Sequence, residues 1–233
     1  MSSKILSMSL LGSLFLVLSI FFLYRGENWP LGVQGIEALG AFVLLLIING
    51  MLFLYNRISS HRNATYQKSV LLGLFTGLLW VTEISINNIL MPGLPARDIL
   101  DDFFWAAIAL IILSASILCA YQTNNIRIGL KVGFWSGFGS GAVACLTGLL
   151  LVVVGIQLLL RDPLNRIEWS ARGATSETPG MAVYFAYQTL AGALLHLVVL
   201  GAIMGIVLGL LGGILGKVGA VLEKRMTAKN ALI

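Results

Sequence analysis

The residues best suited to chemistry are a carboxylate and two amides inside the apolar run 69–91: Glu83, Asn87 and Asn88. Asn87 follows Glu83 by one helical turn, so the two side chains share a helix face. An ionisable group within a bilayer is costly, and it usually faces a protein interior or a water-filled cavity. We expect Glu83 to be either a proton- or cation-responsive site or a neutral carboxyl group that hydrogen-bonds neighbouring helices.

Two further ionisable residues lie in apolar runs, Glu37 in 31–55 and His196 in 184–215. At 1.5 Å per residue, Glu37 lies about 9 Å and Glu83 about 12 Å from the ends of their runs on the same side of the membrane. If the fold brings them together, the two carboxylates would share a proton. His196, about 18 Å into its run, could relay protons or act as a neutral interhelical hydrogen-bonding group.

Ser140 raises an enzymatic alternative. The sequence Gly139-Ser140-Gly141, together with His196 and the glycines that follow it, resembles the serine–histidine pair of the rhomboid intramembrane proteases. The resemblance covers a handful of residues: the rhomboid motif is G-x-S-G, and Phe138 stands at the position of its first glycine. Rhomboids also have a helix between the serine and histidine helices, which the expected elements here do not include. We therefore favour a packing role for Ser140 and no enzymatic activity.

Cofactor chemistry has little support in the sequence. The second histidine of the chain, His61, falls in a loop, so two intramembrane histidines cannot hold a haem within this chain. No spacing of histidine, cysteine or carboxylate residues is typical of a metal site. Cys119 and Cys145 lie within apolar runs and are expected to be small buried hydrophobic residues. We expect no cofactor and no metal.

The elements that position these residues follow from composition. The chain is 58% hydrophobic and 11% charged, whereas soluble domains contain about 25% charged residues. A membrane-spanning helix needs about 20 apolar residues, and the sequence supplies six such runs. We expect one all-α domain over 1–233, a polytopic bundle of six transmembrane helices at about 5–24, 31–55, 69–91, 99–121, 130–160 and 184–215. A short surface helix is expected near 163–172, with Asp162 as its N-cap, Pro163 as its first residue and an Asp162–Arg166 pair.

The net charge of +5 does not indicate nucleic acid, because the basic residues are scattered through short loops. Ten lysines and arginines fall on the side that holds the two termini, the loop between the second and third apolar runs and the loop between the fourth and fifth runs. Five fall on the other side. The positive-inside rule therefore predicts that both termini are cytoplasmic. We expect an integral protein of a prokaryotic inner membrane, with the lipid bilayer and either a homo-oligomer or a larger membrane complex as partners.

Glycines recur at every fourth position in the last two apolar runs, as Gly133, Gly137 and Gly141 and as Gly201, Gly205 and Gly209. This spacing places each set on one stripe, where helix backbones can approach closely, as in a glycine zipper. We expect tight antiparallel contact between these two helices. A less favoured interpretation is that the glycines permit sliding or line a narrow pore.

Together these features favour a small membrane transporter or channel-like protein with an acidic site in the outer half of the bilayer. The predicted site comprises Glu83, Asn87, Asn88, Glu37 and His196. The alternative is a non-catalytic structural or assembly subunit of a larger membrane complex. The first hypothesis requires Glu83 to face a hydrated cavity, and the second places it against a neighbouring helix with all its hydrogen bonds satisfied.

Overall fold

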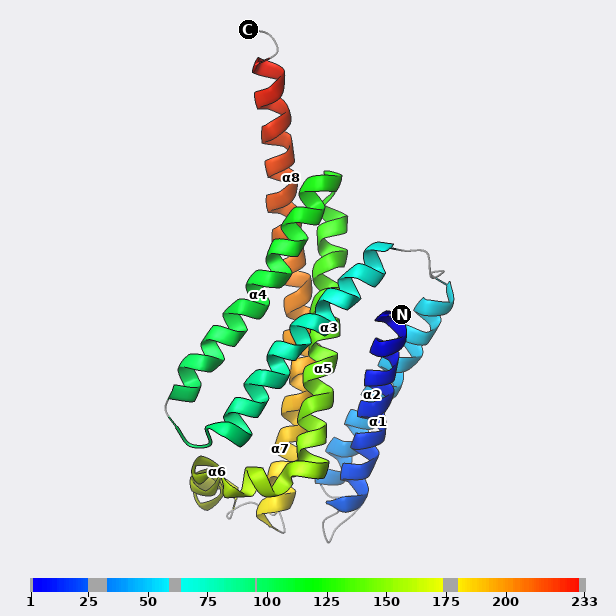
Figure 1. Ribbon diagram of the computed structural model, residues 1–233. Helices are drawn as coiled ribbons and strands as arrows, with labels where there is room; N and C mark the ends of the chain where they lie inside the picture. The colour runs from blue at the N-terminus through cyan, green and yellow to red at the C-terminus, as the bar shows by residue number, and fades with distance from the viewer. Residues whose placement is uncertain (1, 25–32, 59–63, 95, 174–179, 231–233) are drawn as a thin grey trace.

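The computed structural model describes residues 2–24, 33–58, 64–94, 96–173 and 180–230, and these are almost entirely helical (Figure 1). Within these ranges, six helices are long and apolar enough to cross a membrane, which confirms the predicted all-α class and the number of helices that could span it. His61 and the other residues of the 2–3 loop from 59 to 63 lie outside the described ranges. The elements are α1 (Ser2–Leu23), α2 (Val33–Ile58), α3 (Ala64–Ser85), α4 (Ala96–Thr123), α5 (Ile126–Arg161), α6 (Pro163–Glu168), α7 (Met181–Leu195) and α8 (Met204–Asn230).

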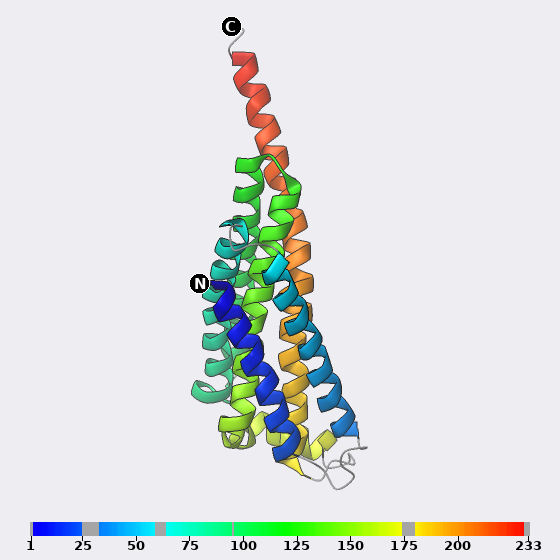
Figure 2. The ribbon, with the colours of Figure 1, turned by 90° about the vertical axis from the view of Figure 1, so that its right-hand side faces the viewer.

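Three short π-helical segments extend or join these helices: η1 (Ile86–Leu90), η2 (Trp169–Gly173) and η3 (His196–Ile203). The sixth span is therefore a single rod of α7, η3 and α8 that ends near Asn230 instead of at 215. Its last part, residues 216–230, holds three lysines and two alanines together with single leucine, glutamate, arginine and methionine residues, all strong helix formers. The drop in hydropathy after residue 215 ends the apolar run, but the helix itself continues to Asn230. Figures 1 and 2 both show α8 projecting beyond the other helices.

Helix α5 lies at the centre of the bundle and packs against α1, α3, α4, α7, η3 and α8 (Figure 1). Helices α1 and α2 pair on one side of it, while α4 packs along α8 on the other. Every residue from Ser136 to Ala142 is buried, and all of them except Phe138 are small. Small side chains on several faces let neighbouring helices approach α5 from different directions.

The glycine stripes of α5 and of the sixth span lie against each other. A Cβ atom on Gly137 would stand 2.7 Å from the Cα atom of Gly205, and one on Gly141 would stand 2.8 Å from that of Gly201. A Cβ atom on Gly133 would overlap the backbone of Gly209. Because the opposing atoms are backbone, they cannot move aside without separating the two helices.

Helix α3 is held equally closely against α5. A Cβ atom on Gly77 would stand 2.6 Å from the side chain of Val143, and Gly73 lies directly on the backbone of Ser136. The Ser136 hydroxyl donates a hydrogen bond of 3.1 Å to the carbonyl of Ser69. These contacts fix the position of the helix that carries Glu83.

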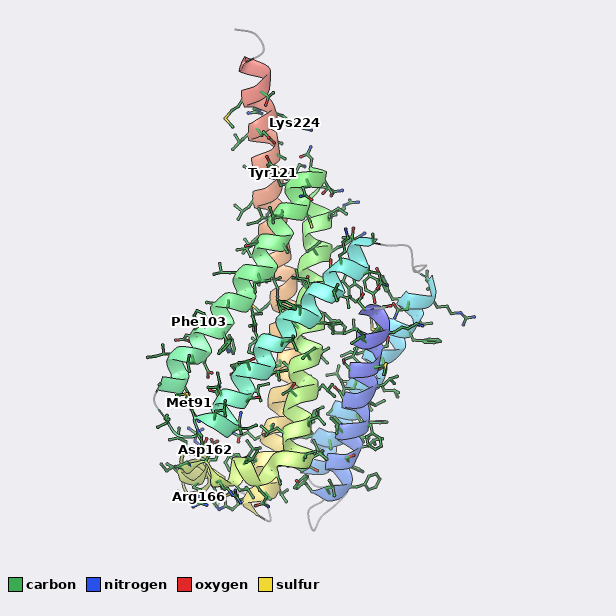
Figure 3. The ribbon with its side chains drawn as sticks, viewed as in Figure 1. Met91, Phe103, Tyr121, Asp162, Arg166 and Lys224 are labelled. Atoms are coloured by element: carbon green, nitrogen blue, oxygen red, sulfur yellow. The ribbon has the colours of Figure 1, made fainter. Side chains whose placement is uncertain are left out.

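An ion pair joins the first turn of α4 to the end of α5. Asp162 is 2% exposed, and its Oδ2 lies 3.0 Å from Nη1 of Arg97. Its Oδ1 accepts a hydrogen bond of 2.9 Å from the backbone N–H of Leu164, which caps α6. Figure 3 shows Asp162 and Arg166 together at this end of the bundle. The predicted Asp162–Arg166 pair is wrong, because Asp162 pairs with Arg97 while Arg166 Nε donates to the carbonyl of Leu160.

The glycine contact predicts that Gly137→Ala destabilises the protein by roughly 1–3 kcal/mol, the usual cost of overpacking. Gly50→Ala is the matched control, because no atom lies within 4 Å of a Cβ placed at Gly50. Thermal unfolding of the purified protein in detergent measures both. Equal midpoints for the two variants would contradict backbone contact at Gly137.

The Arg97–Asp162 pair predicts that Asp162→Ala costs about 3–5 kcal/mol, because it leaves a partly buried arginine without its counter-charge. Asp98→Asn is the control: the Asp98 side chain is 83% exposed and 3.8 Å from Arg97, so about 0–1 kcal/mol is expected there. The same unfolding assay compares them. A loss for Asp162→Ala no larger than that for Asp98→Asn would show that the pair does not hold this junction.

Candidate functional site

One amide bridges two carboxylates where α3 approaches α4. The Nδ2 group of Asn87 donates to Oε1 of Glu83 at 2.8 Å and to Oδ1 of Asp101 at 2.5 Å. Glu83 and Asn87 come from the end of the third span, whereas Asp101 lies in the second turn of α4. We call Glu83, Asn87 and Asp101 the acidic cluster.

Local structure aims these side chains at one another. Glu83 and Asn87 share a face by their spacing, and Asn87 lies in η1, where Met91 N–H donates to the carbonyl of Ile86 at 2.7 Å. Such π-helical turns are frequent at functional sites. Asn88 turns away, because its Nδ2 group donates to the carbonyl of Ile84 at 2.8 Å. Asn88 therefore contributes to the backbone of its own helix rather than to the acidic cluster.

Glu83 is the buried member of the acidic cluster, Asn87 and Asp101 are partly buried, and the hydrogen bonding of the cluster is incomplete. Glu83 is 7% exposed. Its Oε2 atom and the Oδ1 atom of Asn87 are both buried without a hydrogen-bond partner. Most buried polar atoms in proteins have a partner, and leaving one unpaired costs about 1–3 kcal/mol. These two oxygens are acceptors for a proton or a cation.

No basic side chain of the described ranges neutralises the cluster. The ion pairs within those ranges join Arg97 to Asp98 and to Asp162, and none involves Glu83 or Asp101. The asparagine supplies N–H dipoles but no full charge. Two carboxylates this close to one amide cannot both stay ionised at low cost in a low dielectric, so a bound positive charge relieves them.

An aromatic layer lies one helical turn deeper than the carboxylates. Trp80 comes one turn before Glu83 in α3, and Trp105 comes one turn after Asp101 in α4; their ring centroids are 5.4 Å apart. The His196 ring lies edge-on to Trp80 at 4.8 Å. His196 Nδ1 is 2.8 Å from the carbonyl of Gly192. The predicted site residue His196 therefore contacts Trp80, which lies one turn from Glu83 in α3.

Glu37 lies elsewhere. It is exposed on α2, a helix that packs against α1 and α7. The carboxyl group that shares the Asn87 amide with Glu83 is that of Asp101, not that of Glu37. The structure therefore separates two of the predicted site residues, Glu37 and Glu83.

Asp101 was not among the predicted site residues. The sequence does carry a signal for it: Asn87 and Asp101 lie at similar distances from the turn that joins α3 to α4. In an antiparallel helix hairpin, residues equidistant from the turn lie at the same level. Considering polar residues in such pairs would have found Asp101.

The serine and histidine of the rhomboid resemblance do not form a hydrogen bond. Ser140 is 1% exposed, and its hydroxyl oxygen is buried without a partner. In the ranges described, no group of three or more histidine, cysteine, aspartate or glutamate residues is arranged to hold a metal ion. Cys145 is buried, Cys119 is partly buried, and both are free thiols.

Comparison with known proteins returned no relative. No protein-family model matches the chain, and no curated protein or solved structure does so either.

Proposed function

We propose that the chain is a small membrane transporter or channel-like protein whose acidic cluster binds a proton or a monovalent cation. The observation that carries this proposal is the Asn87 amide shared by Glu83 and Asp101, with no ion pair to either carboxylate from a described basic residue. The unpartnered Glu83 Oε2 and Asn87 Oδ1 atoms supply acceptors for the incoming charge.

The proposed orientation places both termini in the cytoplasm of a prokaryotic cell and the cluster in the outer half of its inner membrane. This follows from the excess of lysine and arginine at the end of the bundle that carries the termini. Asp101 then lies about 8 Å from the outer end of α4. Asp101 is only partly buried, and we propose that an incoming ion reaches the cluster past this residue.

The proposed mechanism acts through the contact between α3 and α4. The Asn87–Asp101 hydrogen bond joins the end of the α3–η1 segment to α4. Binding of a proton or cation changes which oxygens Asn87 must satisfy. The occupied and empty states then differ in how firmly α4 is held against the end of α3.

The alternative function, a structural or assembly subunit, has weaker support. It rests partly on glycine-rich faces that could contact other proteins, but the stripes of α5 and of the sixth span face each other, which favours a glycine zipper within the chain. It also requires a fully satisfied Glu83, whereas Oε2 has no partner. A homo-oligomer or a larger complex remains compatible with the transport proposal.

The transport proposal predicts proton or monovalent-cation flux in proteoliposomes that falls at least about tenfold in Glu83→Gln, because amide replacement removes the charge that binds the ion. Asp101→Asn should also lower the flux. Glu37→Gln is the matched control, since Glu37 is exposed on another helix. A pH-sensitive dye inside the vesicles and a potassium or sodium gradient measure the flux, and thermal unfolding checks that each variant is folded. Equal flux in Glu83→Gln and the native protein, or none in either, would remove the proposal.

The orientation predicts opposite labelling of the two ends of the bundle. In a protein whose two native cysteines are replaced by alanine, Arg166→Cys should react with a membrane-impermeant maleimide in intact spheroplasts. Lys224→Cys, on the projecting part of α8 (Figure 3), should react only after permeabilisation. The reverse pattern would place the acidic cluster in the inner half of the membrane.

A further inference from the structure

A crevice of 260 Å³ opens between the first turns of α3 and the last turns of α4, with α5 as its floor. The acidic cluster lies at the opposite ends of α3 and α4, so the crevice is a separate feature. In Figure 1, this end of the bundle is also the one that carries the α4–α5 turn and the projecting α8.

The lining of the crevice changes from polar to apolar along its length. Thr65 and Lys68 lie in the first turns of α3, and Gln122 lies near the last residue of α4. One turn deeper than Lys68 is Leu72, and two turns deeper than Gln122 is Ala115. The polar part therefore lies at the helix ends and the apolar part toward the middle of the bundle, the order of chemistry along a phospholipid.

The polar part is positively charged. Lys68 is exposed, and no lining residue of the crevice is acidic. In the described part of the chain, no carboxylate forms an ion pair with Lys68. Basic pockets between membrane helices bind anionic lipid headgroups. The hydroxyl of Thr65 and the amide of Gln122 are further hydrogen-bond donors to a phosphate at the same rim.

We propose that this crevice binds one anionic phospholipid, with the phosphate against Lys68 and the beginning of an acyl chain against Leu72, Ala115 and Val132 of α5. Its volume is slightly below the roughly 300 Å³ at which pockets for drug-sized molecules begin. The crevice thus holds the headgroup and the first part of one chain, and the remainder of the lipid lies in the surrounding bilayer. The lipid bridges α3 and α4 at the ends opposite to the Asn87–Asp101 hydrogen bond.

Native mass spectrometry of the delipidated, purified protein tests the proposal with phosphatidylglycerol and phosphatidylcholine of identical acyl chains. The native protein should retain one phosphatidylglycerol in preference to phosphatidylcholine. Lys68→Gln should lower that preference about fivefold, the factor that corresponds to the ~1 kcal/mol contributed by one lysine near an anionic membrane surface. Lys131→Gln is the matched control: Lys131 is exposed in the first turns of α5 at the same end but does not line the crevice, so the preference should not change.

Two further arms distinguish a phospholipid site from a site for free phosphate and from a loss of folding. Ala115→Leu narrows the apolar part and should lower retention of both lipids, while its unfolding midpoint reports whether the fold is intact. Glycerol phosphate carries the headgroup chemistry without acyl chains and should not displace the lipid at equal concentration. Equal preference in Lys68→Gln and Lys131→Gln, or full displacement by glycerol phosphate, would overturn the proposal.

Discussion

The burial of Glu83 beside Asp101, with no ion pair to either carboxyl group from a described basic residue, is the constraint on which the site depends. Lipid does not solvate a carboxylate, so a charged group within the apolar layer needs protein dipoles, a counter-charge, water or a proton. The fold supplies one amide, Asn87, and no ion pair from a described basic residue. The arginine nearest along α4, Arg97, is engaged instead by Asp162. The arrangement holds positive charge away from the cluster and leaves its two acceptor oxygens open.

The packing of α5 holds Glu83, a carboxyl group that is costly to bury, in a fixed position. Its run of small buried residues brings α3 and the sixth span into backbone contact, so the central helices form a frame with little freedom to adjust. Glu83 is carried by α3, one of the helices in this frame, whereas Asp101 is carried by α4. The position of Glu83 is thus fixed, and Asp101 approaches it from α4, which the Asn87–Asp101 hydrogen bond joins to the end of the third span.

The helices and part of the acidic cluster could be predicted from the sequence, because they depend on residues close together along the chain. Apolar runs predicted six helices, and the i,i+4 spacing predicted that Asn87 would face Glu83. The predictions that were wrong or incomplete concern residues whose neighbours come from other helices. Asp162 pairs with Arg97, which is distant in sequence, and not with Arg166, which is one turn away. Asp162 is buried where the beginning of α4 meets the end of α5, and the side chain that reaches it there is that of Arg97. Asp101 was missed for the same reason, since its role arises only when two helices meet. Glu37 matched Glu83 in depth, but depth alone does not determine which helices are neighbours.

The free energy of the Asn87–Asp101 hydrogen bond is of the size needed to switch between two arrangements of α4 relative to the end of α3. A hydrogen bond to a charged group contributes about 1.5–3 kcal/mol, whereas a folded domain is stable by about 5–15 kcal/mol. Loss of the Asn87–Asp101 bond is therefore too small to unfold the bundle, yet it is large enough to change the population of two arrangements by more than tenfold. The glycine contacts of α5 do not involve α4 at this level, so they can persist in both arrangements. On the proposed function, occupancy of Glu83 would then alter the position of α4 while α3, α5 and the sixth span remain as they are.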